Sequence, residues 1–152
     1  MPSRVGSEMC IGGRIVEMLT AAGYVVEETM ILPDEAKALK AQLIRMADGR
    51  QVNLVLTTGG TGFSPRDITP EATCAVADRN APGIAEAMRY HSLSITPRGM
   101  LSRGVSVLRG KTLIVNLPGS PKAVQENLEY ILPSLEHGVR IAAGLDGECA
   151  RK

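Results

Sequence analysis

The chain has no tryptophan and a single phenylalanine, and aromatic residues make up only 3% of its 152 residues. Its core must therefore be aliphatic, and few aromatic platforms remain for stacking nucleic-acid bases. The formal net charge of +1 at pH 7 supplies no attraction to DNA or to anionic membranes. No apolar stretch approaches the length of a membrane-spanning helix, and the first residues lack the apolar centre of a signal peptide. We expect a cytoplasmic protein with no nucleic-acid and no membrane partner.

Cysteine and histidine are also scarce, with three and two residues. Cys10, Cys74 and Cys149 form no Cys-x-x-Cys pair and have no histidine at zinc-ligand spacing, so we expect free, reduced thiols. His91 and His137 fit helix positions, and no Ser-His-Asp arrangement connects them to a nucleophile. Hydrolytic and zinc chemistry are therefore not indicated.

What the chain does have is the composition of one ordinary domain. Hydrophobic residues make up 44% and charged residues 22%, and 152 residues are enough to bury one core. We expect a single domain over residues 1–152, with an atypical N-terminus at 1–10 and a flexible polar tail at 145–152.

A glycine-rich stretch follows a short apolar run near the middle of the chain. Residues 53–56 are predicted to form a buried strand, and residues 57–62 read Thr-Thr-Gly-Gly-Thr-Gly. Three glycines let the backbone turn sharply and approach a ligand closely. Thr69 then has the form of a helix N-cap, with Pro70 at the first helical position and Glu71 in the first turn. Such a helix start suits a phosphate, although the glycine spacing is neither that of a P-loop nor that of the dinucleotide fingerprint.

A second loop of the same kind lies towards the C-terminus. Residues 112–117 are predicted to form a buried strand, and residues 118–122 read Pro-Gly-Ser-Pro-Lys. Ser120 is the expected N-cap and Pro121 the first helical residue. In a parallel sheet the two loops would share the carboxyl edge, where open α/β sheets bind their ligands.

The remaining pattern alternates between helix and strand. Predicted helices cover residues 11–22, 35–48, 70–80 and 84–94, with a short helical piece near residue 100. Predicted strands cover 24–32, 53–56, 105–108 and 112–117, the last two joined by a hairpin turn. An apolar stripe begins at residue 121, and Pro133 is expected to divide it into two helices. The alternation predicts an α/β fold, a three-layer α/β/α sandwich with a mainly parallel sheet.

Together the two motifs, residues 57–73 and 116–123, resemble the molybdenum-cofactor biosynthesis proteins of the Mog/MoaB type. The same domain occurs in gephyrin and in the plant molybdenum-insertion proteins, and the resemblance runs from about residue 13 to residue 144. It implies a molybdopterin adenylyltransferase, which transfers AMP from ATP to the molybdopterin phosphate with Mg²⁺ present and releases pyrophosphate. By resemblance, Asp34 and Asp67 match the two acids on which activity in the family depends. The resemblance also implies a homotrimer, with a hexamer as the alternative.

The start of the chain departs from that family pattern. Family members open with an apolar strand and carry Asp-x-Ser/Thr-Gly before the first helix, whereas residues 1–10 hold no strand-like apolar run and Cys10 replaces the acid. We therefore expect the family's first strand to be missing, which would expose a sheet edge. A truncated gene, a misplaced start and a degenerate paralogue all stay open as explanations.

Most of the residues expected to bind substrate and nucleotide lie in the two loops. They are Thr58, Gly59, Gly60, Thr61, Gly62, Arg66, Pro118, Gly119, Ser120 and Lys122. Backbone N–H groups of residues 60–62 can cradle phosphate oxygens, and Asp67 can hold Mg²⁺ across the polyphosphate. Asp34 can hold a second metal or orient the pterin.

Each charged candidate also has a plainer interpretation. Asp34 fits the N-cap of the helix that follows it, and Asp67 fits a first-turn carboxylate favoured by the helix dipole. Lys122 fits a solvated surface lysine. As a whole, the chain is predicted to be an enzyme with Asp34 and Asp67 as its catalytic residues. The alternatives are a catalytically impaired molybdopterin-binding or scaffold protein and a structural interaction module.

The expected oligomer face is the helical stretch around residues 84–101, which is more apolar than a solvated surface requires. The residues in question are Met88, Tyr90, Leu93, Ile95, Met100 and Leu101. The alternative is that these side chains are buried within the subunit.

Overall fold

The computed structural model describes residues 4–5 and 9–145. The helices are α1 (Met9–Ala21), α2 (Ala36–Ile44), α3 (Thr69–Val76), α4 (Pro82–Leu93) and α5 (Pro121–Ala142), with a π-helical turn η1 (Arg45–Gly49) and a 3-10 turn η2 (Pro97–Leu101). The strands are β1 (Arg4–Val5), β2 (Ile31–Leu32), β3 (Leu54–Thr58), β4 (Arg79–Asn80), β5 (Ser106–Arg109) and β6 (Thr112–Leu117). None of these helices is long and apolar enough to span a membrane. Of the predicted tail at 145–152, only Leu145 belongs to the described residues.

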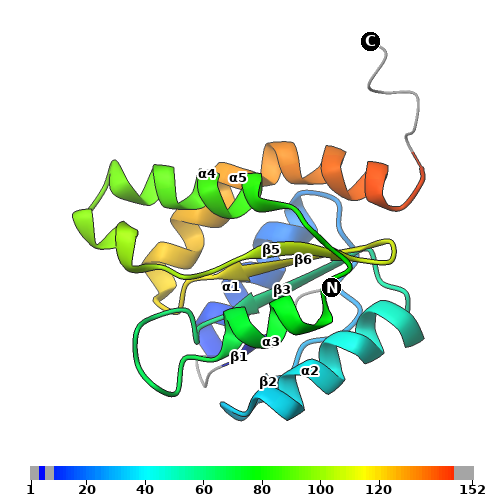
Figure 1. The fold of residues 1–152 in the computed structure, drawn as a ribbon. Coiled ribbons are helices and arrows are strands. Elements are labelled where there is room, and N and C mark those ends of the chain that lie inside the picture. Colours follow the sequence, from blue (N-terminus) through cyan, green and yellow to red (C-terminus); the bar gives the residue numbers. More distant parts are fainter. Residues whose placement is uncertain (1–3, 6–8, 146–152) are drawn as a thin grey trace.

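Helices flank both faces of a four-stranded sheet with the order β3-β6-β5-β4 (Figure 1). Side chains alternate across β3, so Leu54 and Leu56 join a core with α1, α4 and α5, while Val55 joins a second core with α2 and α3. All three are almost completely buried. The predicted α/β architecture is confirmed, and it places the sheet between two aliphatic cores.

The sheet is mixed, so the expectation of a mainly parallel sheet is wrong. β3 and β6 pair in parallel, but β5 pairs with both β6 and β4 in antiparallel fashion. The turn into β6 contains Gly110 at φ +55°, a left-handed conformation that favours glycine. The hairpin was predicted; β4 was not, because its two residues carry no strand pattern of their own.

A strand does precede the first helix, which corrects the expectation that the first strand is missing. β1 pairs in parallel with β2, Arg4 lying opposite Ile31, and it contacts β3. Backbone pairing requires no apolar run, so the sequence of residues 1–10 gave no signal for it. Of the predicted strand over 24–32, only β2 forms. Tyr24 and Val26 pack against the core, and their β-rich pattern reflects burial rather than pairing.

The helices follow the predictions with two corrections. α3 ends at Val76 instead of continuing to residue 80, because the next residues join the sheet as β4. α5 runs unbroken through Pro133, whose side chain is exposed. The apolar stripe is buried on both sides of that proline, from Val124 to Val139, and this packing outweighs the one backbone hydrogen bond that proline removes. The stop at Gly23, φ +94°, is as predicted.

Candidate functional site

The loops after β3 and β6 lie side by side at one edge of the sheet. The two strands stay in register to their ends, with Thr58 opposite Leu117. The Gly59 N–H donates to the Leu117 carbonyl at 3.2 Å, and a Cβ added at Gly119 would lie 3.3 Å from the Gly59 Cα. The predicted meeting of both loops at the carboxyl edge is confirmed, and glycine at position 119 permits their close approach.

The glycine loop folds back onto the start of α3. Gly59 and Gly60 have φ of +81° and +71°, which only glycine adopts easily. The Thr69 N–H donates to the Gly60 carbonyl at 3.2 Å, and a Cβ added at Gly60 would lie 2.1 Å from Thr69 Oγ1. The loop conformation therefore depends on the absence of a side chain at position 60.

Thr69 is not the N-cap, contrary to the sequence prediction. Ile68 occupies that position without a side-chain cap, and Thr69 is the first residue of α3. Its side chain is turned towards Gly60 and is 1% exposed, and Oγ1 has no hydrogen-bond partner among the described residues. The loop thus buries the hydroxyl that would otherwise have capped the helix.

The N-terminus of α5 matches its prediction. Ser120 is the N-cap, its Oγ accepting a hydrogen bond from the Ala123 N–H at 3.2 Å, and Pro121 follows in the first turn. Ser120 and Lys122 are both exposed, directly after the glycine that touches the other loop. A hydroxyl and an ammonium group therefore accompany the helix N-terminus.

Asp67 contacts the C-terminal end of the glycine loop. Its Oδ2 accepts a hydrogen bond from the Ser64 N–H at 2.9 Å, and a Cβ added at Gly62 would lie 2.8 Å from the same oxygen. The interpretation of Asp67 as a first-turn carboxylate is wrong, because α3 begins two residues later and Glu71 is the acid of its first turn. Arg66 is exposed, and its N–H donates to Ser64 Oγ at 3.3 Å.

Asp34 follows β2 and is exposed. The interpretation of Asp34 as a helix cap is wrong, because Glu35 occupies the N-cap of α2 and makes no side-chain cap. Over residues 4–5 and 9–145, no hydrogen bond or ion pair joins Asp34 to either loop. The structure brings Asp67 to the glycine loop, whereas no such hydrogen bond links Asp34 to that loop in the part of the chain that the structure describes.

The scarce cysteines and histidines take no part in this site as far as the structure describes them. Cys74 is a free, exposed thiol on α3, whereas the side chains of Cys10 and Cys149 lie outside the described residues. His91 of α4 stacks on Tyr130 of α5 with ring centroids 4.2 Å apart. Among the described residues, no group of three or more His, Cys, Asp and Glu side chains could hold a metal.

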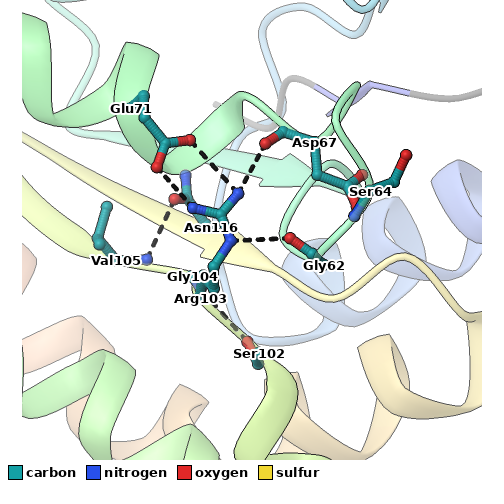
Figure 2. A network of polar contacts seen from close by, with 9 residues as sticks. All are labelled: Gly62, Ser64, Asp67, Glu71, Ser102, Arg103, Gly104, Val105 and Asn116. Carbon is teal, nitrogen blue, oxygen red and sulfur yellow. Dashed lines mark hydrogen bonds and ion pairs between the residues drawn. The ribbon is translucent and has the colours of Figure 1, made fainter.

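Arg103 is the main residue that the sequence did not predict. It precedes β5 and reaches under the glycine loop, where its Nε donates to the Gly62 carbonyl at 2.8 Å and its Nη2 to the Asp67 carbonyl at 2.6 Å (Figure 2). Its Nη1 pairs with Glu71 at 2.5 Å. This hydrogen bond lowers the pKa of Glu71 and raises that of Arg103, so the pair is charged at neutral pH.

Asn116, on β6, forms a buried hydrogen-bond network next to Arg103. It is 1% exposed, and its Nδ2 donates to Thr57 Oγ1 at 2.9 Å and to Thr73 Oγ1 at 3.1 Å. Its Oδ1 accepts from the Val105 N–H at 3.1 Å (Figure 2). One buried amide therefore links β6, β3, α3 and the segment that carries Arg103.

Comparison with known proteins gives the family. Residues 11–137 match the family described as a probable molybdopterin binding domain. The chain is 52% identical over 104 residues to a molybdopterin adenylyltransferase of Haemophilus influenzae, which covers 68% of this chain and 53% of the relative. Gephyrin of Dictyostelium discoideum is 45% identical over 115 residues, which cover 76% of this chain and 16% of gephyrin. The match to the adenylyltransferase thus spans about half of that relative's length.

Solved structures agree over nearly the whole chain. A molybdopterin biosynthesis enzyme MoaB from a Thermus species superposes with a TM-score of 0.88 at 42% identity and covers 94% of both chains. The Mog protein of Mycobacterium ulcerans gives a TM-score of 0.82 at 36% identity, with 93% of this chain and 98% of the other covered. With the fold, the two loops and the sequence match in agreement, the chain belongs to the family of probable molybdopterin binding domains.

Proposed function

We propose that the protein is a molybdopterin adenylyltransferase. The observation that carries the proposal is the meeting of the loops after β3 and β6, each followed by a helix N-terminus, in a chain 52% identical over 104 residues to a protein of that name. The N–H groups of Gly60, Thr61 and Gly62 donate no hydrogen bond to any described residue. Free backbone N–H groups beside a helix N-terminus form a site for phosphate oxygens.

The reaction needs little from the protein beyond position and charge. An oxygen of the molybdopterin phosphate attacks the α-phosphorus of ATP, a new P–O bond forms, and the bond to pyrophosphate breaks. No proton must move in this step, so catalysis rests on alignment and on neutralising the polyphosphate. The free N–H groups of the glycine loop hold phosphate oxygens in line, and Ser120 and Lys122 hold phosphate at the second loop.

Asp67 fits the part of a magnesium ligand. Mg²⁺ bound to a polyphosphate needs only one or two protein carboxylates, so the absence of a larger acidic cluster among the described residues is compatible with it. One oxygen of Asp67 is held by the Ser64 N–H, and the other accepts no hydrogen bond from a described residue. When bound, Mg²⁺ would neutralise charge that develops on the leaving pyrophosphate.

Asp34 keeps its proposed part in the reaction, as a second metal ligand or as a group that orients the pterin. Its support is that the carboxylate is exposed and is not used as a helix cap. Arg66 is likewise exposed beside Asp67, where a guanidinium suits a phosphate.

A homotrimer, with a hexamer as the alternative, is proposed for the assembled protein. Support comes from the apolar face expected on α4 and η2. Its exposed members are Tyr90, Leu93, Ile95, Met100 and Leu101, whereas Met88 is buried within the subunit. Subunit contacts often bury apolar side chains that are exposed on the single subunit.

The direct test is to incubate the purified protein with molybdopterin, ATP and Mg²⁺ and to look for adenylylated molybdopterin. Product that requires all three supports the proposal. Molybdopterin binding without ATP-dependent product would favour the alternative, an impaired binding or scaffold protein.

A further inference from the structure

We propose that Arg103 is a positioning residue of this site, which fixes the glycine loop so that its free N–H groups face the polyphosphate. The proposal deepens the proposed function and rests on it. Arg103 stands in an irregular segment between η2 and β5, with no strand or helix of its own to hold it. Its hydrogen bonds to the glycine loop are therefore what holds Arg103 in position.

Arg103 contacts the loop through its backbone and its side chain. Its N–H donates to the Thr61 carbonyl at 2.8 Å, and its Nε donates to the Gly62 carbonyl at 2.8 Å. Nη2 donates to the Asp67 carbonyl at 2.6 Å. Figure 2 shows the guanidinium between the Gly62 and Asp67 carbonyls and the Glu71 carboxylate. The side chain thus joins the two ends of the segment that carries Asp67.

These contacts set the direction of the loop's donors. In a trans peptide the N–H of one residue points away from the carbonyl of the residue before it, and the described chain has no cis peptide. Gly60, Thr61 and Gly62 each have their carbonyl anchored, the first by Thr69 and the other two by Arg103. The next N–H in each case therefore points away from its anchor. The anchored carbonyls therefore fix the N–H groups of Thr61, Gly62 and Phe63, the first two of which belong to the proposed phosphate site.

Arg103 acts on the loop rather than on the substrate. Its Nε, Nη1 and Nη2 are all engaged with protein acceptors, and its charge is balanced by Glu71. Glu71 is itself largely exposed, with 61% of its side chain accessible, so that ion pair contributes less than the two carbonyl contacts. The carbonyl contacts are the ones that position the loop.

Arg109 offers a matched control at the other end of α3. Its Nη1 donates to the Val76 carbonyl at 2.8 Å, and its Nη2 pairs with Asp48 at 2.7 Å. Arg103 and Arg109 thus combine the same kinds of contact, but no hydrogen bond of Arg109 within the described residues reaches either loop. Arg→Lys at each position removes the planar fork and keeps the charge.

The experiment compares Arg103→Lys with Arg109→Lys in three measurements: hydrogen exchange of residues 59–67, calorimetric binding of ATP with Mg²⁺, and kcat/KM for adenylyl transfer. We expect Arg103→Lys alone to speed exchange in that segment, to weaken ATP binding at least fivefold and to lower kcat/KM about ten- to a hundredfold, since a misplacement of about 1 Å can cost that much. Equal effects of the two variants would show a merely structural role and overturn the proposal.

The exchange measurement keeps this inference separate from the proposed function. If the wild type forms no adenylylated product, the proposed function fails, while faster exchange confined to Arg103→Lys still supports the positioning role. If Arg103→Lys does not fold, Arg103→Gln decides in its place, because its shorter amide loses at least one of the two carbonyl contacts. Faster exchange of residues 59–67 with a loss of kcat/KM of about tenfold would support the positioning role, and wild-type exchange and kcat/KM would overturn it.

Discussion

Replacing Gly60 by alanine should be costly for two separable reasons. At φ +71° an L-residue pays about 1–2 kcal/mol of backbone strain. The new Cβ would also lie 2.1 Å from Thr69 Oγ1 and 3.1 Å from Thr69 Cβ, so the start of α3 must shift. Overpacking of this kind costs about 1–3 kcal/mol. Together the free energy of unfolding should fall by about 2–5 kcal/mol, which lowers Tm by about 4–20 °C for a chain of this size.

Two further variants separate strain from overlap. Gly110 also has a positive φ, +55°, but nothing lies within 4 Å of a Cβ added there. Gly110→Ala should therefore show the strain alone, about 1–2 kcal/mol. Thr69→Ala removes a buried hydroxyl that has no partner among the described residues, so by itself it should change stability by less than about 1 kcal/mol. In the Thr69→Ala background, Gly60→Ala should cost clearly less than in the wild type, although more than Gly110→Ala, because the 3.1 Å approach to the Cβ of residue 69 remains.

The assay is urea denaturation of the four single and double variants at one fixed protein concentration, since assembly would make stability depend on concentration. The double-mutant cycle of Gly60→Ala and Thr69→Ala should give a coupling free energy of about 1–3 kcal/mol between the two positions. Additive effects, or equal costs of Gly60→Ala and Gly110→Ala in the wild-type background, would show that the Thr69 side chain does not compete for the space beside Gly60.

Three other outcomes are expected. Asp67→Asn should keep the fold and molybdopterin binding but lose about a hundredfold or more in turnover, since one major electrostatic stabiliser contributes about 3–4 kcal/mol to the barrier; unchanged turnover would remove Asp67 from the mechanism. Arg103 lowers the pKa of Glu71 from its ordinary value of 4.5, so the pair stabilises the fold above that pH and loses this effect as the pH falls through the lower folded-state pKa. The stability gap between wild type and Glu71→Gln should therefore narrow between pH 7 and pH 3 in denaturation experiments, and a constant gap would contradict it. Light scattering at micromolar concentration should give a trimer mass, and a monodisperse monomer would end the oligomer proposal.

Local patterns were enough to predict the two loops. A buried strand, a glycine or proline turn and a helix start follow one another within about 20 residues in each case, so neighbouring residues alone define the geometry. The Ser120 cap and the Gly23 stop belong to the same class, because a cap depends on residues within one helical turn. The shared edge of the sheet then follows from the parallel pairing of β3 and β6.

Features that depend on distant residues could not be predicted. Arg103 meets its partners 32 to 42 positions earlier in the chain, and nothing in its own neighbourhood distinguishes it from a surface arginine. The pairings of β1 and β4 depend on backbone atoms of strands elsewhere in the chain, so two-residue strands leave no pattern. Such contacts form only in the complete fold, so local sequence patterns do not reveal them.

In other places a correct local tendency was overruled by packing. Thr69 has a strong capping tendency, yet the glycine loop buries its side chain and moves the cap to Ile68. Pro133 disfavours helix, yet the buried stripe on both sides keeps α5 continuous. In both cases tertiary contacts exceed a local preference of about 1–3 kcal/mol.

The proposed reaction transfers AMP from ATP to molybdopterin. The most direct measurement follows ATP labelled at the α-phosphorus or at the γ-phosphorus through a reaction with molybdopterin and Mg²⁺. We expect the α label to appear in the molybdopterin fraction, while the γ label is released as pyrophosphate in equal amount. Label from the γ-phosphorus in the pterin product, or no transfer of either label although molybdopterin is bound, would contradict it.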